Sequence, residues 1–341
     1  MNALRPSVTA VVLAYGDEPW IEACVKSVLA SKGVTVDVVI VDNGDLTGVT
    51  ARLEGRLGVR VVRPDVNLGY AGGCNAGARI ATGDVIALVN SDAVVELNCL
   101  AELTRVASIS HVGIATASVR LADRPELLNS RGNPMHYLGV VWAGGFGEPA
   151  ADHRDEQDVA TASGACMAIR RSLWEGLGGF DDEYFAYHED TELSLRCHLR
   201  GLTVRYVPSA IARHRYEFSR NPTKNYLLER NRFLTLLTVY SRRTLLLVLP
   251  ALLLLEVPTL TAAAAQGWGG AKLRGYWWLL THLEHVRSRR ARVQSERVVP
   301  DRVLARLLVG RIEPANVALP PGANLLNAVL GMYWSAVRRM L

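Results

Sequence analysis

The sequence predicts an α/β fold, in which a mostly parallel sheet is flanked by helices and followed by a helical C-terminal region. In the first half of the 341 residues, short apolar runs rich in valine and isoleucine alternate with segments whose apolar residues recur at helical spacing. Strands that are apolar throughout indicate a parallel sheet covered on both faces by helices. The composition changes near residue 241, where long leucine-rich and arginine-rich segments begin.

The strands of the predicted sheet are apolar runs that end in polar residues or glycine. In chain order they are 8–15, 36–44, 59–64 and 84–93. An apolar stripe from Trp20 to Leu29 predicts a helix after the first strand, and the glycine-rich segment 67–83 is expected to enter a helix before the fourth. In such sheets the ligand lies at the carboxyl ends of the strands, so the polar residues there are candidate binding residues.

Charge and cysteine content restrict the partners and the compartment. The net charge of +5 conceals 15 Lys and Arg against 26 Asp and Glu in residues 1–195, and 23 against 7 in residues 196–341. A basic half indicates an anionic partner: nucleic acid, a membrane surface or a phosphorylated ligand. The five cysteines are far apart and form no CxxC pair, which favours a reducing compartment. No apolar stretch near the N-terminus suits a signal peptide, so we expect residence on the cytoplasmic side.

The apolar segment 244–268 predicts contact with a membrane. It is interrupted by Pro250, Glu256 and Pro258, and the 12 residues before Glu256 are too few for a hydrocarbon core of about 30 Å. Extended to residue 265, a span would place Glu256 in the middle of the membrane, at a cost of roughly 2.5–3.5 kcal/mol. We therefore expect an interfacial or re-entrant hairpin rather than a plain span.

Two amphipathic segments follow, each joining an aromatic and aliphatic stripe to arginines. The first is 276–293, and the second is the last helix, in which the apolar residues from Leu325 to Leu341 share a face beside Arg338 and Arg339. Such helices suit a headgroup layer. The alternative is that they pack on the preceding domain or form a homo-oligomer. We expect a domain over 1–240 and a membrane-associating region over 241–341.

A second group of observations concerns possible metal ligands. Asp92 directly follows an apolar strand, and Mg²⁺ or Mn²⁺ typically takes one or two protein carboxylates and completes its shell with phosphates and water. The alternative is an ordinary turn residue. His214 closes a predicted strand 24 residues after Asp190, and an imidazole beside Asp92 would favour Mn²⁺ over Mg²⁺.

The glycine-rich segment and the acidic segment each allow two interpretations. "NLGYAGGCNAG" lacks the spacing of a dinucleotide fingerprint, yet its glycines would let the backbone approach a diphosphate, with Asp42 reading a base or ribose. The alternative is a plain loop. In "HEDTELSLR", Glu189, Asp190 and Glu192 either serve chemistry or favour the first turn of a helix.

Taken in order, these motifs resemble the family 2 glycosyltransferases, which have the Rossmann-like GT-A fold. The resemblance covers roughly residues 7–240. It rests on VxxAY, VDNG, NxGxAGGxNxG, NSD as a variant of the DxD metal motif, SGACMAIRR, GGFDDEYF, HEDTELSLR and a closing histidine. Within the family the chain looks most like bacterial rhamnosyltransferases that use dTDP-L-rhamnose and a polyprenyl-diphosphate-linked GlcNAc in cell-envelope synthesis.

The resemblance implies a role for each matching residue. Asp190 would be the general base with Glu189 beside it, and Asp92 and His214 would hold Mn²⁺ or Mg²⁺. The donor-binding residues would be Tyr15, Asp42, Asn67, Gly72, Gly73, Asn75, Asn90 and Ser91. The acceptor-binding residues would be Gly164, Ala165, Arg220, Lys224 and Arg230, although the basic residues of 214–232 suit anionic headgroups equally well.

The chain departs from the family pattern at two places. Gly16 stands where the family usually has Asn after the first-strand tyrosine, so recognition of the donor base is expected to differ. Asn90 and Ser91 replace acids of the metal motif, which leaves one carboxylate and predicts weak metal binding without donor.

The predicted function is therefore metal-dependent, inverting sugar transfer at the cytoplasmic face of the membrane. Such a displacement needs a base on the acceptor side and a metal on the leaving-group side. The alternative within the family is a UDP- or GDP-sugar donor with another glycolipid or polysaccharide acceptor. A nucleic-acid-binding protein is not expected, because no motif for it is present. A nucleotidyltransferase would need an N-terminal glycine-rich loop bearing Arg or Lys, which is also lacking.

Overall fold

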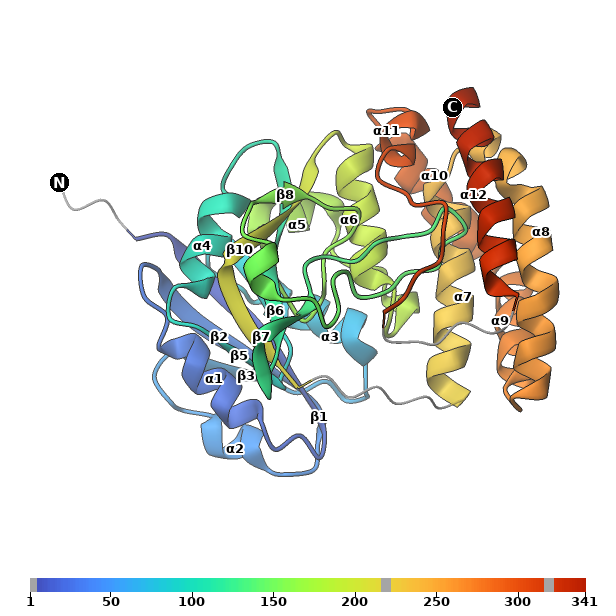
Figure 1. Ribbon diagram of the computed structural model, residues 1–341. Coiled ribbons are helices and arrows are strands. Elements are labelled where there is room, and N and C mark those ends of the chain that lie inside the picture. Colours follow the sequence, from blue (N-terminus) through green and yellow to red (C-terminus); the bar gives the residue numbers. More distant parts are fainter. Residues whose placement is uncertain (1–4, 216–221, 316–321) are drawn as a thin grey trace. The chain divides into compact units, whose positions relative to one another are not determined.

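The computed structural model describes residues 5–215, 222–315 and 322–341 (Figure 1). The chain forms two compact units. The first comprises Met1–Asn133, Ala143–Cys197 and Leu202–Glu217, and the second comprises Pro134–Trp142, His198–Gly201 and Phe218–Leu341. The second unit begins before residue 241, where the composition changes, because helix α7 (Pro222–Val239) packs against the later helices α9 and α10.

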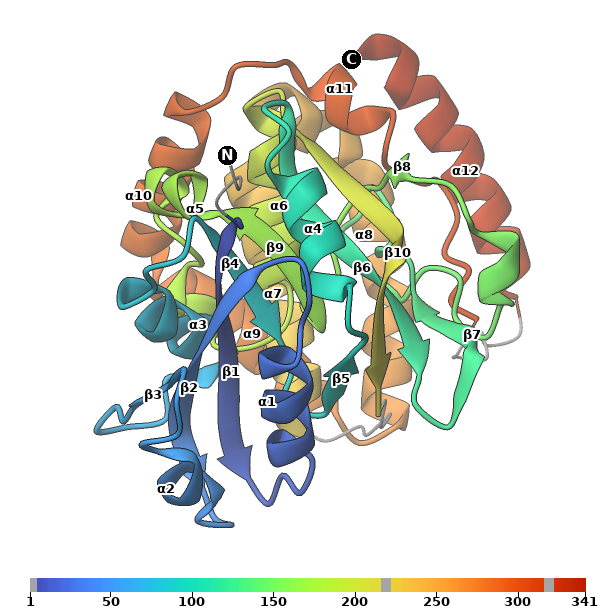
Figure 2. The same ribbon diagram turned by 90° about the vertical axis from the view of Figure 1, so that its left-hand side faces the viewer.

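The first unit is built on a 10-stranded sheet in the order β3-β2-β1-β4-β9-β6-β10-β5, with β7 beside β6 and β8 beside β10 (Figure 2). The strands are β1 Ser7–Gly16, β2 Thr35–Asp45, β3 Val59–Val62, β4 Val85–Val89, β5 Ala93–Val95, β6 Val112–Leu121, β7 Arg124–Ser130, β8 Gln157–Asp158, β9 Cys166–Arg170 and β10 Thr203–His214. Pairing is parallel from β3 to β4, as the sequence predicts, and between β6 and β10. β9 runs antiparallel between β4 and β6, which makes the other half mixed.

Helices cover both faces of this sheet. They are α1 Ile21–Leu29, α2 Val49–Leu53, α3 Gly69–Arg79, α4 Cys99–Ala107, α5 Arg171–Leu177 and α6 Glu189–Leu199, with short 3-10 turns η1 Ala150–Asp152 and η2 Asp182–Tyr184. Alternate residues of β1 divide between the faces, because successive side chains of a strand point to opposite sides. Val12 packs in one core with Val25 of α1 and Leu103 of α4.

The glycine-rich segment forms helix α3 on the other face, and its glycines allow close packing on the sheet. A Cβ on Gly77 would lie 2.5 Å from Cγ1 of Val11, and one on Gly73 would lie 2.6 Å from Cδ2 of Leu13. Real side chains do not approach so closely, so a side chain at Gly77 would force α3 away from the stiff valine of β1, and one at Gly73 would force the end of Leu13 to move. The interpretation of this segment as a plain loop is therefore wrong.

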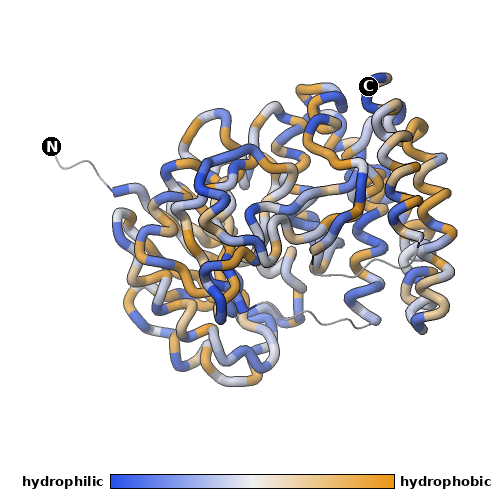
Figure 3. Tube along the Cα trace, in the orientation of Figure 1, coloured by the Kyte–Doolittle hydropathy of each residue, from blue (hydrophilic) through white to orange (hydrophobic). Residues whose placement is uncertain are grey.

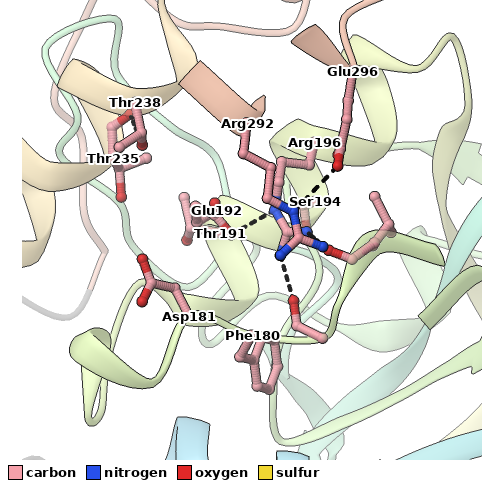
Figure 4. Close-up of polar contacts among 12 residues, drawn as sticks. Phe180, Asp181, Thr191, Glu192, Ser194, Arg196, Thr235, Thr238, Arg292 and Glu296 are labelled. Carbon is pink, nitrogen blue, oxygen red and sulfur yellow. Dashed lines mark hydrogen bonds and ion pairs between the residues drawn. The ribbon is translucent and has the colours of Figure 1, made fainter. Parts of the chain in front are cut away.

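Glu192, the third acid of the opening turn of α6, has a structural role. Its carboxylate accepts a 2.8 Å hydrogen bond from Nε of Arg196, one helical turn later, and both side chains are almost completely buried. Arg196 also donates to the carbonyl oxygens of Leu177, at 2.9 Å, and Gly179, at 2.5 Å (Figure 4). The pair thereby ties α6 to the chain that follows α5.

The second unit consists of helices around a small core. They are α7 Pro222–Val239, α8 Arg242–Ala265, α9 Gly269–Thr281, α10 Leu283–Ser295, α11 Asp301–Ala305 and α12 Ala323–Met340. The ring of Trp334 from α12 stacks on Tyr137 with centroids 4.6 Å apart. The apolar stripe predicted for the last helix is thus divided: Leu330, Trp334 and Val337 are buried within the unit, whereas Leu325 and Met340 are exposed.

Residues 244–265 lie in one continuous helix, α8, which passes through Pro250 and Pro258 without turning back. The expectation of a re-entrant hairpin within this segment is wrong, since one helix runs from Arg242 to Ala265. α8 is long and apolar enough to cross a membrane by length and composition, and 17% of its most apolar window is buried within the protein. Figure 3 shows hydrophobic residues along most of its length.

We predict that Glu192→Gln destabilises the protein by about 3–5 kcal/mol, because it leaves the buried guanidinium of Arg196 without its counter-charge. The free energy of unfolding in urea measures the effect. The control is Glu175→Gln, which removes an exposed ion pair of the same i,i+4 spacing with Arg171 and should change stability by less than about 1 kcal/mol. Equal effects for the two variants would contradict the structural role of Glu192.

Candidate active site

Asp92 and His214, the two predicted metal ligands, are brought together at the end of the sheet. Oδ1 of Asp92 lies 3.1 Å from Nε2 of His214, and Nδ2 of Asn90 lies 3.4 Å from the same nitrogen. Antiparallel pairing of β5 and β10, with His214 opposite Ala93, makes this meeting possible. Ser91 lies half-buried in the turn between β4 and β5. Within the described ranges no group of three or more His, Cys, Asp or Glu side chains could hold a metal, so a cation here would have two such ligands.

Asn129, which the sequence analysis did not identify, orients the imidazole of His214. Its Oδ1 lies 3.0 Å from Nδ1 of the ring, and the residue is buried at the end of β7. A hydrogen bond from Nδ1–H to Asn129 leaves the lone pair of Nε2 directed toward Asp92, where it can ligate a metal. No sequence motif identifies Asn129, because its position beside His214 depends on the pairing of β7 with β6.

Asp190 is held by backbone hydrogen bonds in a second cluster. Its Oδ2 accepts from the N–H of Gly164 at 2.9 Å, and its Oδ1 accepts from the N–H of Thr191 at 2.6 Å. The carbonyl oxygen of Gly164 accepts in turn from the hydroxyl of Tyr70 at 2.7 Å. Burial raises the pKa of Asp190, against these hydrogen bonds, which lower it. A carboxylate whose pKa is raised in this way accepts a proton more readily than an ordinary aspartate.

Glu189 differs from its neighbour in environment. Its side chain is buried, and in the described part of the chain its Oε2 has no hydrogen-bond partner. Burial, and next the charge of Asp190, hold the pKa of Glu189 well above its usual range. The surroundings of the two adjacent carboxyl groups thus differ: burial and the neighbouring charge favour the protonated form of Glu189, whereas the N–H donors favour the charged form of Asp190.

The backbone that leads into these acids is strained. Phe185, Tyr187 and His188 have φ angles of 59°, 70° and 70°, values that non-glycine residues rarely adopt. The carbonyl oxygen of Phe185 accepts from the N–H of Ala71, and a Cβ on Gly69 would lie 2.3 Å from that oxygen. Contact with the start of α3 therefore fixes the turn that aims Glu189 and Asp190. Strain of this kind gathers at functional sites.

The peptide between Gly164 and Ala165 connects the two clusters. The N–H of Asn90 donates to the carbonyl oxygen of Ala165 at 2.9 Å, next to the residue that binds Asp190. This link continues the antiparallel pairing of β4 with β9, in which Val89 is opposite Cys166. Asp190, the predicted base, and the strand end that precedes Asp92, the predicted cation ligand, are thereby attached to adjacent residues of one segment.

Two predicted donor-binding residues lie at the ends of β1 and β2. Tyr15 is 64% exposed, a solvent-facing ring on which a base can stack. Asp42 organises the loop after β2: its carboxylate accepts from the N–H of Asp45 at 2.9 Å and from the hydroxyl of Thr50 at 2.7 Å. A donor that contacts Asp42 would have to bind the remaining lone pairs of these two carboxylate oxygens.

The other predicted donor-binding residues support α3. Oδ1 of Asn67 accepts from the N–H of Gly69, and the amide of Asn75 bonds both the carbonyl oxygen and the N–H of Phe180, each at 3.0 Å. Gly72 and Gly73 are buried. Asn67 and Asn75 thus anchor loops, and Gly72 and Gly73 pack in the interior. The donor-binding roles of these four residues stay predictions.

Gly16 adopts a φ of +65°, and a Cβ there would meet no atom within 4 Å. Asn is the side chain that best tolerates this left-handed conformation. The backbone at Gly16 is therefore one that glycine adopts freely and that Asn would also tolerate.

The predicted acceptor-binding cations belong to the second unit or fall outside the structure. Arg220 lies outside the described residues. Lys224 is partly exposed on α7. Arg230 is 5% exposed, with its guanidinium over the ring of Trp278 at 4.7 Å and a hydrogen bond from Nε to Asn231, so it already contributes to packing within its unit. The roles of all three stay predictions.

Known proteins resemble this chain in sequence and in fold. Over 228 residues it is 28% identical to N-acetylglucosaminyl-diphospho-decaprenol L-rhamnosyltransferase of Mycobacterium tuberculosis, covering 60% of this chain and 74% of the relative. The structure is similar to that of GalNAc-T7 with UDP, GalNAc and Mn²⁺, with a TM-score of 0.59 and 15% identity over 71% of this chain and 49% of that one. It is also similar to the mannosyltransferase PcManGT from Pyrobaculum calidifontis in complex with GDP-Man and Mn²⁺, with a TM-score of 0.52 and 16% identity over 86% of each chain.

The family assignment rests on the larger part of the chain. Residues 6–233 match the family described as "Glycosyltransferase like family 2". This range contains both clusters, the strands that carry them and the glycine-rich helix α3. The fold expected from the sequence is thereby confirmed, and the chain belongs to the family 2 glycosyltransferases with the GT-A fold.

Proposed function

We propose that this protein transfers a sugar, with inversion, from a nucleotide-diphosphate donor to the hydroxyl of a lipid-linked acceptor. The observation that carries the proposal is the placement of Asp190 and Asp92 on either side of the Gly164–Ala165 peptide, one able to take a proton and the other able to bind a cation. An inverting displacement requires these two functions on opposite sides of the reacting carbon.

In this reaction the acceptor hydroxyl gives its proton to the carboxylate of Asp190. The acceptor oxygen forms a bond to the anomeric carbon as the bond from that carbon to the donor's diphosphate oxygen breaks. The bonding electrons leave with the nucleoside diphosphate. Hydrogen bonds from Gly164 and Thr191 orient the carboxylate, which accepts the proton from the face opposite the leaving group.

Asp92 and His214 fit a divalent cation, Mn²⁺ or Mg²⁺, which would offset the charge that develops on the leaving diphosphate. A carboxylate oxygen and an imidazole nitrogen face each other, and the donor's phosphates and water would complete the shell. The imidazole favours Mn²⁺. The Mn²⁺ present in the structures of GalNAc-T7 and PcManGT supports this assignment.

For the substrates we propose L-rhamnose from dTDP-rhamnose as donor and a polyprenyl-diphosphate-linked GlcNAc as acceptor. The mycobacterial relative supports this choice, because its name specifies rhamnosyl transfer to N-acetylglucosaminyl-diphospho-decaprenol. The second candidate is a UDP- or GDP-sugar donor, which the UDP and GDP-Man of the two related structures favour. A lipid-linked acceptor implies action at a membrane surface, and we propose its cytoplasmic face.

The proposal is tested by nucleoside-diphosphate release from a panel of sugar nucleotides, with Mn²⁺ and polyprenyl-diphosphate-GlcNAc. Acceptor-dependent release from dTDP-rhamnose alone is the expected result. Release from a UDP- or GDP-sugar instead would retain the reaction and replace the donor. Absence of acceptor-dependent release from every donor would contradict the proposed substrates.

Asp190→Asn is expected to reduce turnover by roughly 10²–10⁴-fold while donor binding persists, since the amide cannot accept the proton. Glu189→Gln is the matched variant: because burial and the charge of Asp190 favour the protonated form of Glu189, the neutral amide should preserve most of the activity. Turnover measures the first effect, and calorimetric titration with donor and Mn²⁺ verifies binding. If Asp190→Asn remained active, or if Glu189→Gln were the more damaging change, Asp190 would not be the base.

Asn129→Ala is expected to weaken Mn²⁺ binding in the presence of donor nucleotide by about 10–100-fold, because the imidazole of His214 loses the partner that fixes its orientation. Electron paramagnetic resonance of free Mn²⁺ measures this without turnover. Asn98→Ala, at an exposed helix start where the side chain caps nothing, is the control. Unchanged Mn²⁺ affinity in Asn129→Ala would eliminate the orienting role.

A further inference from the structure

Helix α8 presents an exposed apolar face from Leu246 to Leu260. The residues of this face recur every three or four positions, as expected for one side of a helix. They are Leu246, Leu249, Leu253, Val257 and Leu260, and Leu246 and Val257 are 71% and 69% exposed. Between them Val248, Ala251 and Leu255 are buried on the opposite side. An uninterrupted apolar face of this length on a soluble surface marks an interaction site.

The buried side of α8 is attached to its neighbours by charge. Glu256 is ion-paired with Arg232 of α7 and with Lys272 of α9, whose Nζ lies 2.9 Å from Oε2. Tyr276 also donates to Glu256. Lys272 is completely buried and Arg232 nearly so.

Glu229 of α7 completes this network. It contacts the same two cations, and although burial disfavours its charge, Arg232 and Lys272 lower the pKa of Glu229 to about 2. Against the effect of burial, the pKa of Glu256 is lowered as well, by Arg232 and the hydrogen bonds that Glu256 accepts, so both carboxylates stay charged at neutral pH. α8 cannot leave α7 and α9 without leaving buried charges unpaired, so only its outer face can contact lipid.

Arginines lie at one end of the exposed face. Arg242 and Arg243 begin α8, and Arg338 and Arg339 end α12; all four are exposed. Nη2 of Arg243 donates to the carbonyl oxygen of Met340 at 2.5 Å, which brings the two ends together. Two arginines at the start of α8 oppose the helix dipole, so helix stability does not explain them.

Acidic residues are nearly lacking on the same two helices. α12 has no Asp or Glu, and α8 has only Glu256, which the buried cations neutralise. The surface therefore combines an apolar face with an unbalanced positive end. This combination is complementary to a bilayer that contains anionic lipids.

We propose that α8 and α12 form a docking face for an anionic membrane, on which α8 lies in the plane of the headgroup layer and does not cross the bilayer. The leucines of the outer face enter the acyl boundary, and the four arginines contact lipid phosphates. This docking is independent of the proposed transfer reaction and requires no donor or acceptor. Because it is tested without substrate, its failure is distinguishable from failure of the proposed function.

The first experiment measures binding of the full chain to vesicles by flotation. Phosphatidylcholine vesicles that contain phosphatidylglycerol are expected to bind the protein, and pure phosphatidylcholine vesicles to bind it less. Leu253→Glu combined with Val257→Glu should reduce binding by at least roughly tenfold, because two exposed apolar side chains that would enter the acyl boundary are replaced by charges. Arg338→Gln combined with Arg339→Gln should lose roughly fivefold per arginine, and only on anionic vesicles.

The matched control is Leu57→Glu, which changes a 98% exposed leucine in the first unit and should leave vesicle binding unchanged. Thermal unfolding verifies that each variant is folded. Absence of flotation with anionic vesicles would overturn the proposal. So would concentration-dependent dimerisation that the Leu253→Glu, Val257→Glu variant abolishes in a protein that does not bind vesicles, because the face would then belong to a second copy.

The second experiment distinguishes lying from crossing. The native cysteines are all buried, so single cysteines introduced by Arg242→Cys and Gln266→Cys report on the two ends of α8. With protein added outside vesicles, an impermeant maleimide should label both ends. Protection of one end together with labelling of the other would indicate a span and overturn the in-plane arrangement.

Discussion

Two hydrogen bonds on either side of the Gly164–Ala165 peptide hold the active site together. One joins Ala165 to Asn90, at the end of the strand that carries Asp92, and the other joins Gly164 to Asp190. Both depend on the antiparallel entry of β9 beside β4, which interrupts the parallel half of the sheet. Because backbone groups of two adjacent residues, Gly164 and Ala165, make these contacts, the placement of the predicted base relative to the strand end before Asp92 is fixed by the sheet rather than by flexible side chains.

Around this frame, residues that are close in the sequence serve either packing or the predicted chemistry. The glycines of α3 are needed where the helix approaches the sheet, and Gly69 is needed where Phe185 crosses its start. The strained turn at 185–188 then presents two adjacent carboxyl groups in unlike surroundings. Glu192, one residue beyond Thr191, is a structural acid paired with Arg196. A stretch of acids that looks uniform in sequence thus divides into a buried carboxyl group with a raised pKa, a carboxylate held by backbone N–H donors and a buried ion pair.

In the helical unit, ion pairs give the two sides of helix α8 different roles. Two buried cations, Arg232 and Lys272, and two half-buried carboxylates, Glu229 and Glu256, join α7, α8 and α9, so hydropathy along α8 does not by itself define its relation to a membrane. The same helix has an inner face that requires protein and an outer face that suits lipid. A peripheral enzyme acting on a lipid-linked substrate, as proposed here, benefits from such a face, because it concentrates the protein where the acceptor is found.

The sequence alone determined the α/β class, the parallel strands, the helix that starts at Glu189 and the strand that ends in His214, because periodicity and turn chemistry are local properties. It also brought forward Asp92, His214 and Asp190 through ordered motifs. It did not reveal Asn129, the antiparallel position of β9, the packing role of Gly73 and Gly77, or the continuity of α8 through two prolines. These features depend on residues far apart in the chain, whose contacts exist only when the strands and helices have assembled.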